Sequence, residues 1–585
     1  MKKILGLALV GAIAIVSPVR AEQSLFLSYP RPNHTTTSRK IFLIGTAPPT
    51  GDVFINGQKI ERSPAGHFAP SFPLEIGVNE FTLRHGDREI KISVTRKSSE
   101  PKLPQGLGFA EDSLQPAANL ARMPGELICF SAIASANASV SVRVGSQTTI
   151  LMPQEEIVDL PMNIAALIDQ NMPLVRKVAG HYKGCTNALT TPGNLGLPEF
   201  QVSKNGQTIT QKGLGQIEIL SPSQFEIAEV TAEAGVARTG PSTEHTRLTP
   251  LPKGTRSRIT GSEGEFVRLD YGGWIKKEET KTVPGSIPPS SIVRSLRYSQ
   301  VPLWTEIFFP LQVAVPVTVK QGEKTLTLTL YNTTAETHTF RLDDDPVVNR
   351  MEFEQPEPGR VEYTFNFKSE QQWGYKLRYE GTTLVLSLRH PPDIRGGAQP
   401  LAGMKIAIDA GHGSSEDLGA VGPNGYPEKD VTLIVSKLLR DELEKRGATV
   451  FMTREAEEDL WPLDRVEMIE KEEPNLALSV HYNALPDAGD AINTAGIGMF
   501  WYHPQAHSLS VFLHNYLVQR LGRPSYGVFW NSLALARSHV TPSVLLELGF
   551  MINPYEFEWI TNEEEQKKLA ATLADGVVEW VRSAQ

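Results

Sequence analysis

Four residues in the last third of the chain have the types and positions that a catalytic metal centre requires. His412 follows the apolar run in KIAIDAGHGSS (residues 405–415), His481 follows LALSV, Glu547 ends SVLLE, and Glu428 lies just before a predicted helix. Two imidazoles and one carboxylate with an open fourth position are the usual arrangement for catalytic zinc, which lowers the pKa of a bound water. We therefore predict that His412, Glu428 and His481 bind one Zn²⁺. Glu547, outside this ligand set, is predicted to be the general base.

The neighbouring residues suggest how these four are held. Glycines on both sides of His412 allow a sharp turn out of the strand and leave room for a metal ion. Asp409, or a neighbouring carbonyl, is a candidate for orienting the His412 ring. Asn483, two residues after His481, is a candidate for binding a substrate amide. Arg454 is more typical of a structural ion pair than of a substrate clamp.

Simpler structural roles remain open for some of these residues. Glu428 near a helix N-terminus would also favour the helix dipole, whether or not it binds metal. Glu547 within the apolar run VLLELGF would be costly to bury unless it is paired or close to a metal ion. His503 and His539 are further candidates for lining a substrate groove.

The elements that must position these residues alternate between strand and helix from residue 404 onward. The segment after Glu428 has the periodicity of a half-buried helix, with apolar side chains at Val431, Ile434, Val435, Leu438 and Leu439. Strands that alternate with helices predict an α/β domain with a mostly parallel sheet flanked by helices on both faces. Ligands bind at the carboxyl ends of the strands in such sheets, and three of the four candidates follow or end a predicted strand.

Several motifs occur in order from residue 404 to the end of the chain. They are IDAGHGSSEDLGAVGPNGYPEKD, TR at 453–454, LDR at 463–465, SVHYNA at 479–484 and LLELGFMIN at 545–553. Together they resemble the zinc-dependent N-acetylmuramoyl-L-alanine amidase family. The resemblance implies Zn²⁺ binding by His412, Glu428 and His481 and catalysis by Glu547. It also implies peptidoglycan as the substrate, cleaved at the amide between N-acetylmuramic acid and the L-alanine of the stem peptide.

The sequence departs from the family pattern at two positions next to the ligands. Ser414 stands where the family often has glycine, and Tyr482 stands where it often has a small residue. Both substitutions leave the ligands in place and are expected to reshape the groove. Some division-linked members carry an insertion that forms a helix blocking the active site. Only about forty residues separate Tyr502 from Ser543 here, so we expect no such plug.

The upstream part of the chain is predicted to be a series of all-β modules. Short β-branched and aromatic runs between turn residues indicate an immunoglobulin-like domain at 23–97 and, after a linker at 98–124, a second β-rich domain at 125–222. Residues 225–282 resemble a bacterial SH3-like module, and a linker is predicted at 283–299. Residues 300–395 weakly resemble the envelope-targeting β domain of some cell-wall amidases. The catalytic domain is predicted to span 400–585.

The N-terminus has the pattern of a targeting segment. Lys2 and Lys3, the apolar run 4–16 and the small residues near position 21 predict a signal peptide at 1–21. The apolar run is too short to span a bilayer comfortably, although an uncleaved anchor remains an alternative. We therefore expect an exported protein of the periplasm or cell envelope, without a stable membrane span after cleavage. In an oxidising compartment, Cys129 and Cys185 would either form one disulfide or remain as two separate buried thiols.

Charge and composition limit the class of partner. The formal net charge of the 585 residues is −9, and from residue 401 onward 15 Lys and Arg stand against 27 Asp and Glu. An acidic catalytic domain argues against a nucleic-acid partner. The β modules could instead bind peptidoglycan, or envelope or cell-division proteins. Two alternatives to the amidase hypothesis are a zinc peptidase acting on wall peptides and a wall-binding scaffold whose catalytic domain has decayed.

Overall fold

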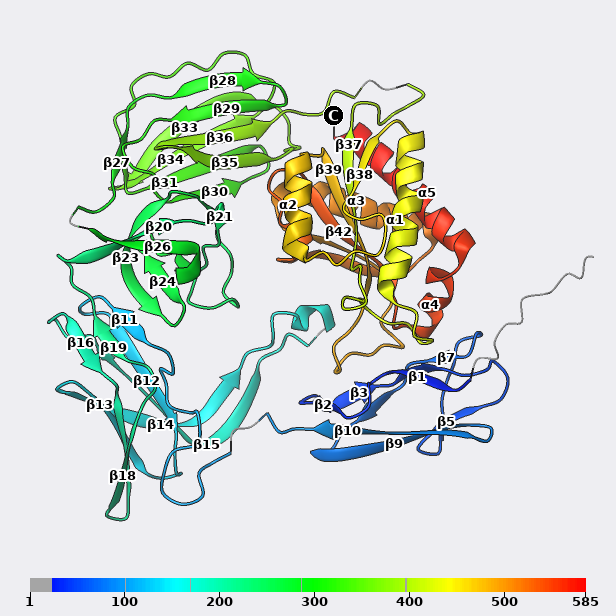
Figure 1. Cartoon of the computed structure of the whole chain (residues 1–585), viewed down its shortest axis with the longest axis horizontal. Helices are drawn as coiled ribbons and strands as arrows, with labels where there is room; N and C mark the ends of the chain where they lie inside the picture. The colour runs from blue at the N-terminus through cyan, green and yellow to red at the C-terminus, as the bar shows by residue number, and fades with distance from the viewer. Residues whose placement is uncertain (1–23, 100–101, 169, 286, 395–396, 585) are drawn as a thin grey trace, which may run out of the picture.

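The computed structural model describes residues 24–99, 102–168, 170–285, 287–394 and 397–584 (Figure 1). It confirms β-rich modules followed by a C-terminal α/β domain. The predicted signal peptide lies outside the described residues. The individual domain boundaries remain predictions, and the modules are described here by their strands and hydrophobic cores.

The N-terminal module surrounds a core that includes Leu43, Val53 and Phe68. Its strands are β1 (Phe26–Tyr29), β2 (His34–Thr36), β3 (Lys40–Phe42), β4 (Ile44–Thr46), β5 (Val53–Ile55), β6 (Gln58–Lys59), β7 (His67–Phe68), β8 (Ser71–Pro73), β9 (Gly77–His85) and β10 (Arg88–Arg96). The largest sheet has the order β2-β10-β9-β5-β6, and smaller sheets β1-β4-β7 and β3-β8 complete the module.

The second module contains the long hairpin β14–β15 and a disulfide between Cys129 and Cys185, which joins β12 to β15. Its elements are β11 (Leu120–Arg122), β12 (Leu127–Ile133), β13 (Ser139–Val144), β14 (Gln147–Asp159), η1 (Ala165–Ile168), β15 (Leu174–Asn187), β16 (Gly193–Gly196), β17 (Glu199–Lys204), β18 (Gln207–Lys212) and β19 (Ile217–Ile219). Leu114 and Leu120 belong to its core. The segment 98–124, predicted as a linker, therefore contributes core residues, because isolated apolar side chains among prolines have no periodic pattern.

The third module, which corresponds to the SH3-like segment, has its own small core that includes Leu251 and Ile275. Its elements are β20 (Phe225–Val230), β21 (Ala234–Gly235), β22 (Leu251–Pro252), β23 (Arg256–Glu263), β24 (Phe266–Leu269), β25 (Trp274–Lys276), η2 (Lys277–Glu279) and β26 (Thr280–Gly285). Strand β23 also pairs with β11, so one sheet continues from the second module into the third.

The fourth module packs two four-stranded sheets around a shared core that includes Leu328, Tyr363 and Leu386. Its strands are β27 (Ser291–Val293), β28 (Arg297–Val301), β29 (Trp304–Phe309), β30 (Val317–Gln321), β31 (Thr325–Tyr331), β32 (Thr333–Ala335), β33 (Val348–Glu357), β34 (Arg360–Phe367), β35 (Tyr375–Glu380) and β36 (Thr383–Arg389). The sheet orders are β30-β31-β34-β33 and β28-β29-β36-β35. Strands β27 and β28 begin within the predicted linker 283–299, so part of that segment is also structured.

The C-terminal domain is built on a six-stranded sheet of order β38-β37-β39-β42-β40-β41. Its elements are β37 (Lys405–Ala410), α1 (Glu428–Lys445), β38 (Thr449–Met452), α2 (Pro462–Glu472), β39 (Leu476–Asn483), β40 (Ile497–Trp501), η3 (Pro504–Ala506), α3 (His507–Leu521), β41 (Ser525–Trp530), η4 (Ala534–Ala536), β42 (Ser543–Phe550), α4 (Pro554–Ile560) and α5 (Glu563–Ser583). Strands β38, β37, β39 and β42 are parallel, whereas β40 runs antiparallel to β42. The carboxyl ends of the four parallel strands therefore share one edge.

The two faces of this sheet bury different sets of side chains. Ile408, Leu478 and Leu546 point toward a core that contains helices α1, α3 and α5. Alternate residues such as Ala477 and Leu545 face α2 and η4 on the other side. Residues i and i+2 share a face of a strand, so one face of β42 carries Leu545 and then Glu547.

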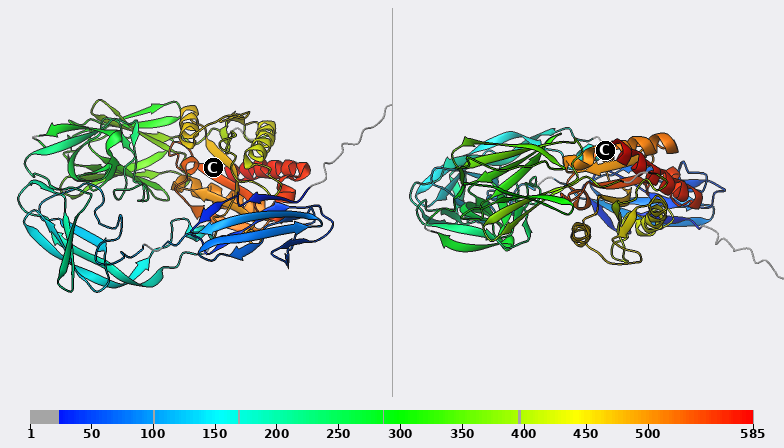
Figure 2. Two further views of the ribbon diagram at one scale, coloured as in Figure 1. Left: turned by 60° about the horizontal axis from the view of Figure 1, so that its bottom comes forward. Right: turned by 90° about the horizontal axis from the view of Figure 1, so that it is seen from above.

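The N-terminal module packs against the C-terminal domain near the carboxyl end of β42. Phe42 and Ile44 contact a cluster that includes Phe550 and Ile552. The module stays beside the C-terminal domain in the rotated views (Figure 2). No helix in the described part of the chain is both long enough and apolar enough to cross a membrane.

Helix α1 provides a test of the packing, because its periodic residues differ in burial. Leu439 is fully buried, whereas Ile434 is 40% exposed. We expect Leu439→Ala to lower the free energy of unfolding of the C-terminal domain by about 2–5 kcal/mol, because it removes buried contacts and leaves a cavity. The matched Ile434→Ala should cost less than about 1 kcal/mol. Urea unfolding followed by tryptophan fluorescence measures the free energy of unfolding of both variants. Equal losses in the two variants would contradict this assignment of the buried and exposed faces of α1.

Candidate metal centre

The structure brings the three predicted ligands together at the carboxyl edge of the sheet. His412 follows β37, His481 lies near the end of β39, and Glu428 is the first residue of α1. One potential ligand atom from each residue lies within 4.8 Å of the others. Glu428 Oε2 is 3.2 Å from His412 Nε2, and Glu428 Oε1 is 3.1 Å from His481 Nδ1. The carboxylate therefore stands between the two imidazoles.

Backbone groups hold the Glu428 carboxylate in place. The N–H of Ala420 donates to its Oε2 at 2.7 Å, and the N–H of Tyr482 donates to its Oε1 at 2.9 Å. Burial opposes ionisation, but the hydrogen bonds and positive charges of His412 and His481 lower the pKa of Glu428 far below its usual range. The site thus holds an ionised carboxylate, which is the form that binds a cation.

The His412 ring is oriented by Asp417 rather than by Asp409. His412 Nδ1 lies 2.6 Å from Asp417 Oδ1, which leaves Nε2 facing Glu428. Burial lowers the pKa of His412, but Glu428 and Asp417 outweigh it and raise this pKa to about 9. A carboxylate behind an imidazole is the usual way to fix the tautomer of a metal-binding histidine.

The space around the ligands fits a small cation. A Cβ atom on Gly411 would lie 2.3 Å from the His481 ring. A Cβ on Gly419 would lie 2.5 Å from both Glu428 Oε2 and the His412 ring, and Gly419 also has a φ of +68°. Side chains at these positions would fill the cradle. Two imidazole nitrogens and a carboxylate suit zinc and similar divalent metals.

Glu547 lies beside this cluster on the neighbouring strand. It pairs in register with His481 across β39 and β42. Among the described residues, its buried Oε2 has no hydrogen-bond partner. Burial, together with the negative charge of Glu428, raises the pKa of Glu547 well above its usual value. An unsatisfied buried carboxyl group is costly in a protein interior, so its position here calls for a functional explanation.

Asp409 belongs to a buried network beneath the ligands. It accepts hydrogen bonds from Ser479 at 2.6 Å and Thr453 at 2.6 Å, and it pairs with Arg465 at 2.8 Å. Burial disfavours its charge, but Arg465 more than compensates, and the pKa of Asp409 is lowered. Arg465 also donates to the carbonyl of His412 at 2.6 Å. His412 has a left-handed backbone with φ of 59°, so this bond stabilises an uncommon conformation.

Arg454 binds backbone carbonyls, and the structure shows no carboxylate partner for it in the described residues. It donates to Ala410 O at 2.8 Å, Gly411 O at 2.9 Å and Lys429 O at 2.7 Å. These bonds tie the turn after β37 to the start of α1. Burial and the neighbouring Arg465 lower the pKa of Arg454 to about 10. Its contacts support a positioning role rather than the ion pair expected from sequence.

The remaining sequence candidates are placed in different ways. Asn483 accepts a hydrogen bond from the N–H of Ala484 at 2.8 Å. Tyr482 is buried in the core on the α1 side, and it therefore does not line the groove on the opposite face. The Ser414 hydroxyl accepts from the N–H of Asp417 at 3.1 Å, so it helps to order the loop that orients His412.

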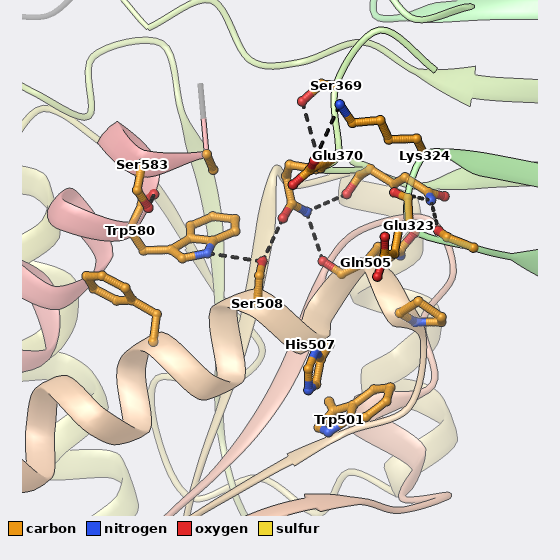
Figure 3. Close-up of a pocket in the computed structure, with 16 residues that line it drawn as sticks. Glu323, Lys324, Ser369, Glu370, Trp501, Gln505, His507, Ser508, Trp580 and Ser583 are labelled. Atoms are coloured by element: carbon orange, nitrogen blue, oxygen red, sulfur yellow. Dashed lines mark hydrogen bonds and ion pairs between the residues drawn. The ribbon is translucent and has the colours of Figure 1, made fainter. Parts of the chain in front are cut away.

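The opposite edge of the sheet contains His503, His539 and a cavity. Burial lowers the pKa of His503 to about 3 and that of His539 to about 4, so both are neutral. The cavity has about 730 Å³ and lies between the fourth module and α3, near Trp501 and His507 (Figure 3). Strand β40 ends at Trp501 and runs antiparallel to β42. This cavity is therefore remote from His412 and Glu547, and the two histidines do not line the metal groove.

Sequence reasoning left two functional residues without a role. Asp417 is one of several acidic residues in a loop without periodicity, and only the folded loop shows which of them faces His412. Arg465 occurs in the LDR motif, but its contact with the His412 carbonyl joins α2 to the turn after β37. Neither the fold of an irregular loop nor an arginine contact between elements leaves a local pattern in the sequence.

Comparisons with known proteins agree with this geometry. Residues 406–579 match the family model described as N-acetylmuramoyl-L-alanine amidase. The chain is 32% identical over 203 residues to the germination-specific N-acetylmuramoyl-L-alanine amidase of Bacillus subtilis, covering 31% of this chain and 81% of that protein. It is 32% identical over 180 residues to the probable cell wall amidase LytH of Staphylococcus aureus, covering 30% of this chain and 58% of that protein.

A solved structure, the amidase AmiC2 of Nostoc punctiforme, is 27% identical in sequence. The match covers 31% of this chain and 97% of that chain, with a TM-score of 0.29. The family relationship is based on the sequence relatives, and the family match lies within the C-terminal domain.

The contact between Asp417 and His412 can be tested through metal affinity. We expect Asp417→Asn to weaken Zn²⁺ binding by about 10- to 100-fold, because the ring of His412 loses the carboxylate that fixes its tautomer. The exposed neighbour Glu416 provides the matched control, and Glu416→Gln should bind as the wild type does. Competition with a chromophoric chelator measures both constants. Unchanged affinity in Asp417→Asn would exclude this role.

Proposed function

The chain belongs to the N-acetylmuramoyl-L-alanine amidase family and is a peptidoglycan amidase, and we propose that a single zinc ion held by His412, Glu428 and His481 serves its reaction. The observation that carries this proposal is the convergence of three potential metal ligands beside Glu547, whose Oε2 has no hydrogen-bond partner in the described part of the chain. The bond cleaved is the amide between the lactyl group of N-acetylmuramic acid and L-alanine.

When bound, zinc supplies Lewis acidity, which polarises the scissile carbonyl and lowers the pKa of water at the site. The protein contributes the geometry. Glu428 is fixed by backbone N–H groups, His412 by Asp417, and the turn after β37 by Arg454 and Arg465. These contacts keep the ligands in position without large rearrangement, as efficient catalysis requires.

Glu547 is proposed to move the proton. A general base must be ionised, and burial together with the charge of Glu428 raises the pKa of Glu547, which opposes this form. Ionised Glu547 is favoured once a cation occupies the ligand set, because the nearby positive charge offsets burial and the charge of Glu428. Glu547 then takes a proton from the attacking water and returns it to the leaving amine of L-alanine.

The β modules are proposed to place the catalytic domain on the cell wall. The name of the S. aureus relative, a probable cell wall amidase, supports an exported location at the periplasm or envelope. The SH3-like third module and the fourth module are the proposed wall-binding parts. The four modules account for most of the described chain before the family match.

The role of Glu547 is tested by removing its charge without changing its size. We expect Glu547→Gln to lower amidase activity by about 10²- to 10⁴-fold, which is the usual contribution of general acid–base catalysis. Zinc content should stay the same, because Glu547 is outside the ligand set. Dye release from labelled peptidoglycan and metal analysis measure the two properties. Glu579→Gln, an exposed change on α5, is the control, and equal activity in both variants would refute the proposal.

The metal and the bond cleaved are tested together by chelation and product analysis. A chelator should abolish activity, and Zn²⁺ should restore it whereas Mg²⁺ should not, because imidazole ligands favour the softer metal. Mass spectrometry should find intact stem peptides with a free N-terminal alanine. Peptides cut within the stem would indicate a zinc peptidase instead. Zinc-loaded protein that releases no product would indicate a wall-binding scaffold.

A further inference from the structure

The hairpin β14–β15 extends away from the second module and reaches the C-terminal domain (Figure 1). We name its end, residues 160–168 and 170–173, the arm tip. It contains the short 3₁₀ turn η1. A segment that starts about 250 residues before the metal ligands in the sequence thus lies against the domain that carries them.

The arm tip binds two different parts of the C-terminal domain. Leu167 packs against the cluster on the α2 face of the sheet, which also involves Tyr526 and Phe529. The hydroxyl of Tyr526 donates a hydrogen bond to the backbone oxygen of Leu167. Gln170 Nε2 donates to the carbonyl of Ala488, in the loop after β39, at 3.3 Å. The tip therefore bridges the beginning of β41 and the loop that follows His481.

These two anchoring points lie on either side of the strand that carries Glu547. In the sheet order β39-β42-β40-β41, β42 lies between β39, which leads to Ala488, and β40, whose other neighbour β41 carries Tyr526. A Cβ on Gly498 would lie 2.9 Å from the Tyr526 ring and 3.6 Å from Glu547 Cβ. The Tyr526 ring therefore covers Gly498 right beside Glu547. The arm tip contacts this ring, on the same face of the sheet as the metal centre.

The arm tip does not seal the site. The side chains of His412 and His481 remain 25% and 15% exposed, so a small molecule can approach the ligands. A polymer needs much more room, because glycan strands and cross-linked peptides extend beyond the bond that is cleaved. An element that contacts Tyr526 and Ala488, on the two sides of β42, obstructs a polymer more than it obstructs a short fragment.

We propose that the arm tip forms one wall of the substrate groove and makes Leu167 a specificity-determining residue. With the tip in place, the enzyme prefers short soluble wall fragments, and displacement of the tip opens the groove to polymeric peptidoglycan. This inference rests on the proposed amidase function. It assigns the substrate preference of that site to a segment of the second module.

Leu167 can be changed without disturbing the rest of the tip. Three of the other apolar residues of the tip are largely exposed: Leu160 is 80% exposed, Met162 67% and Met172 79%. Leu167 supplies the apolar contact with the cluster on the α2 face, whereas Leu160 offers the same side chain without that contact. An aspartate at position 167 places a charge against the aromatic cluster and should release the tip.

The test compares full-length wild type, Leu167→Asp and Leu160→Asp on two substrates. One is dye-labelled intact peptidoglycan sacculi, and the other is a soluble muropeptide obtained by complete glycan-strand digestion. We expect Leu167→Asp to raise the rate on sacculi at least fivefold while kcat/KM on the muropeptide changes less than twofold. Leu160→Asp should match the wild type on both substrates. Hydrogen exchange of residues 160–175 should be faster in Leu167→Asp alone, and zinc content should be equal in all three proteins.

The outcomes separate this inference from the function on which it rests. If Leu167→Asp leaves the ratio of the sacculus rate to the muropeptide rate unchanged, the inference is overturned. This holds if both rates rise together, as expected for a simple plug, and also if neither rate rises. A similar effect of Leu160→Asp also overturns it, because that residue lacks the contact. If none of the proteins hydrolyses either substrate, the proposed function fails together with this inference.

Discussion

The charge of Glu428 is the constraint around which the catalytic site is built. A carboxylate that is only 3% exposed must be compensated, since burying an isolated charge is very costly. Two backbone N–H groups, two imidazoles and the N-terminus of α1 provide this compensation. The same requirement explains the neighbouring glycines, because side chains on Gly411 or Gly419 would occupy the space between these groups. A site assembled for one buried anion is thereby ready to hold a cation.

A second group of residues around the site holds the backbone of the turn that carries His412, rather than the ligand side chains. Arg454 and Arg465 bind the carbonyls of the turn that follows β37, and Asp409 holds Arg465 in place. Guanidinium groups suit this task because their several N–H donors are fixed in one plane. The turn carries His412 in a left-handed conformation, which would be unfavourable without such support. The position of the first histidine thus depends on strands β37 and β38 and on helix α2 together.

Two of the β modules contact the C-terminal domain near the edge of the sheet that carries the metal centre. The N-terminal module contacts Phe550 and Ile552, and the arm tip contacts Tyr526 and Ala488. Phe550 ends the strand that carries Glu547, Ala488 follows the strand that carries His481, and Tyr526 lies two strands from Glu547. The single helix between Tyr502 and Ser543, α3, buries Leu509, Leu513 and Leu517 in the core on the other face. Access to the metal centre is therefore shaped by other modules rather than by this helix.

The sequence alone determined the α/β character of the C-terminal domain, the identity of the ligands as candidates, and the order of the strands and helices that carry them. These features are local, since helical periodicity and strand-ending motifs are written in neighbouring residues. The periodic residues of α1 show the limit of such patterns, because Val431, Val435 and Leu439 are buried while Ile434 is partly exposed. Tertiary structure alone decided that Asp417 orients His412, that Arg454 binds carbonyls, that Cys129 bonds to Cys185, and that Leu167 reaches Tyr526. The last three contacts join residues from different segments, and the first depends on how one loop folds, so the spacing along the chain encodes none of them.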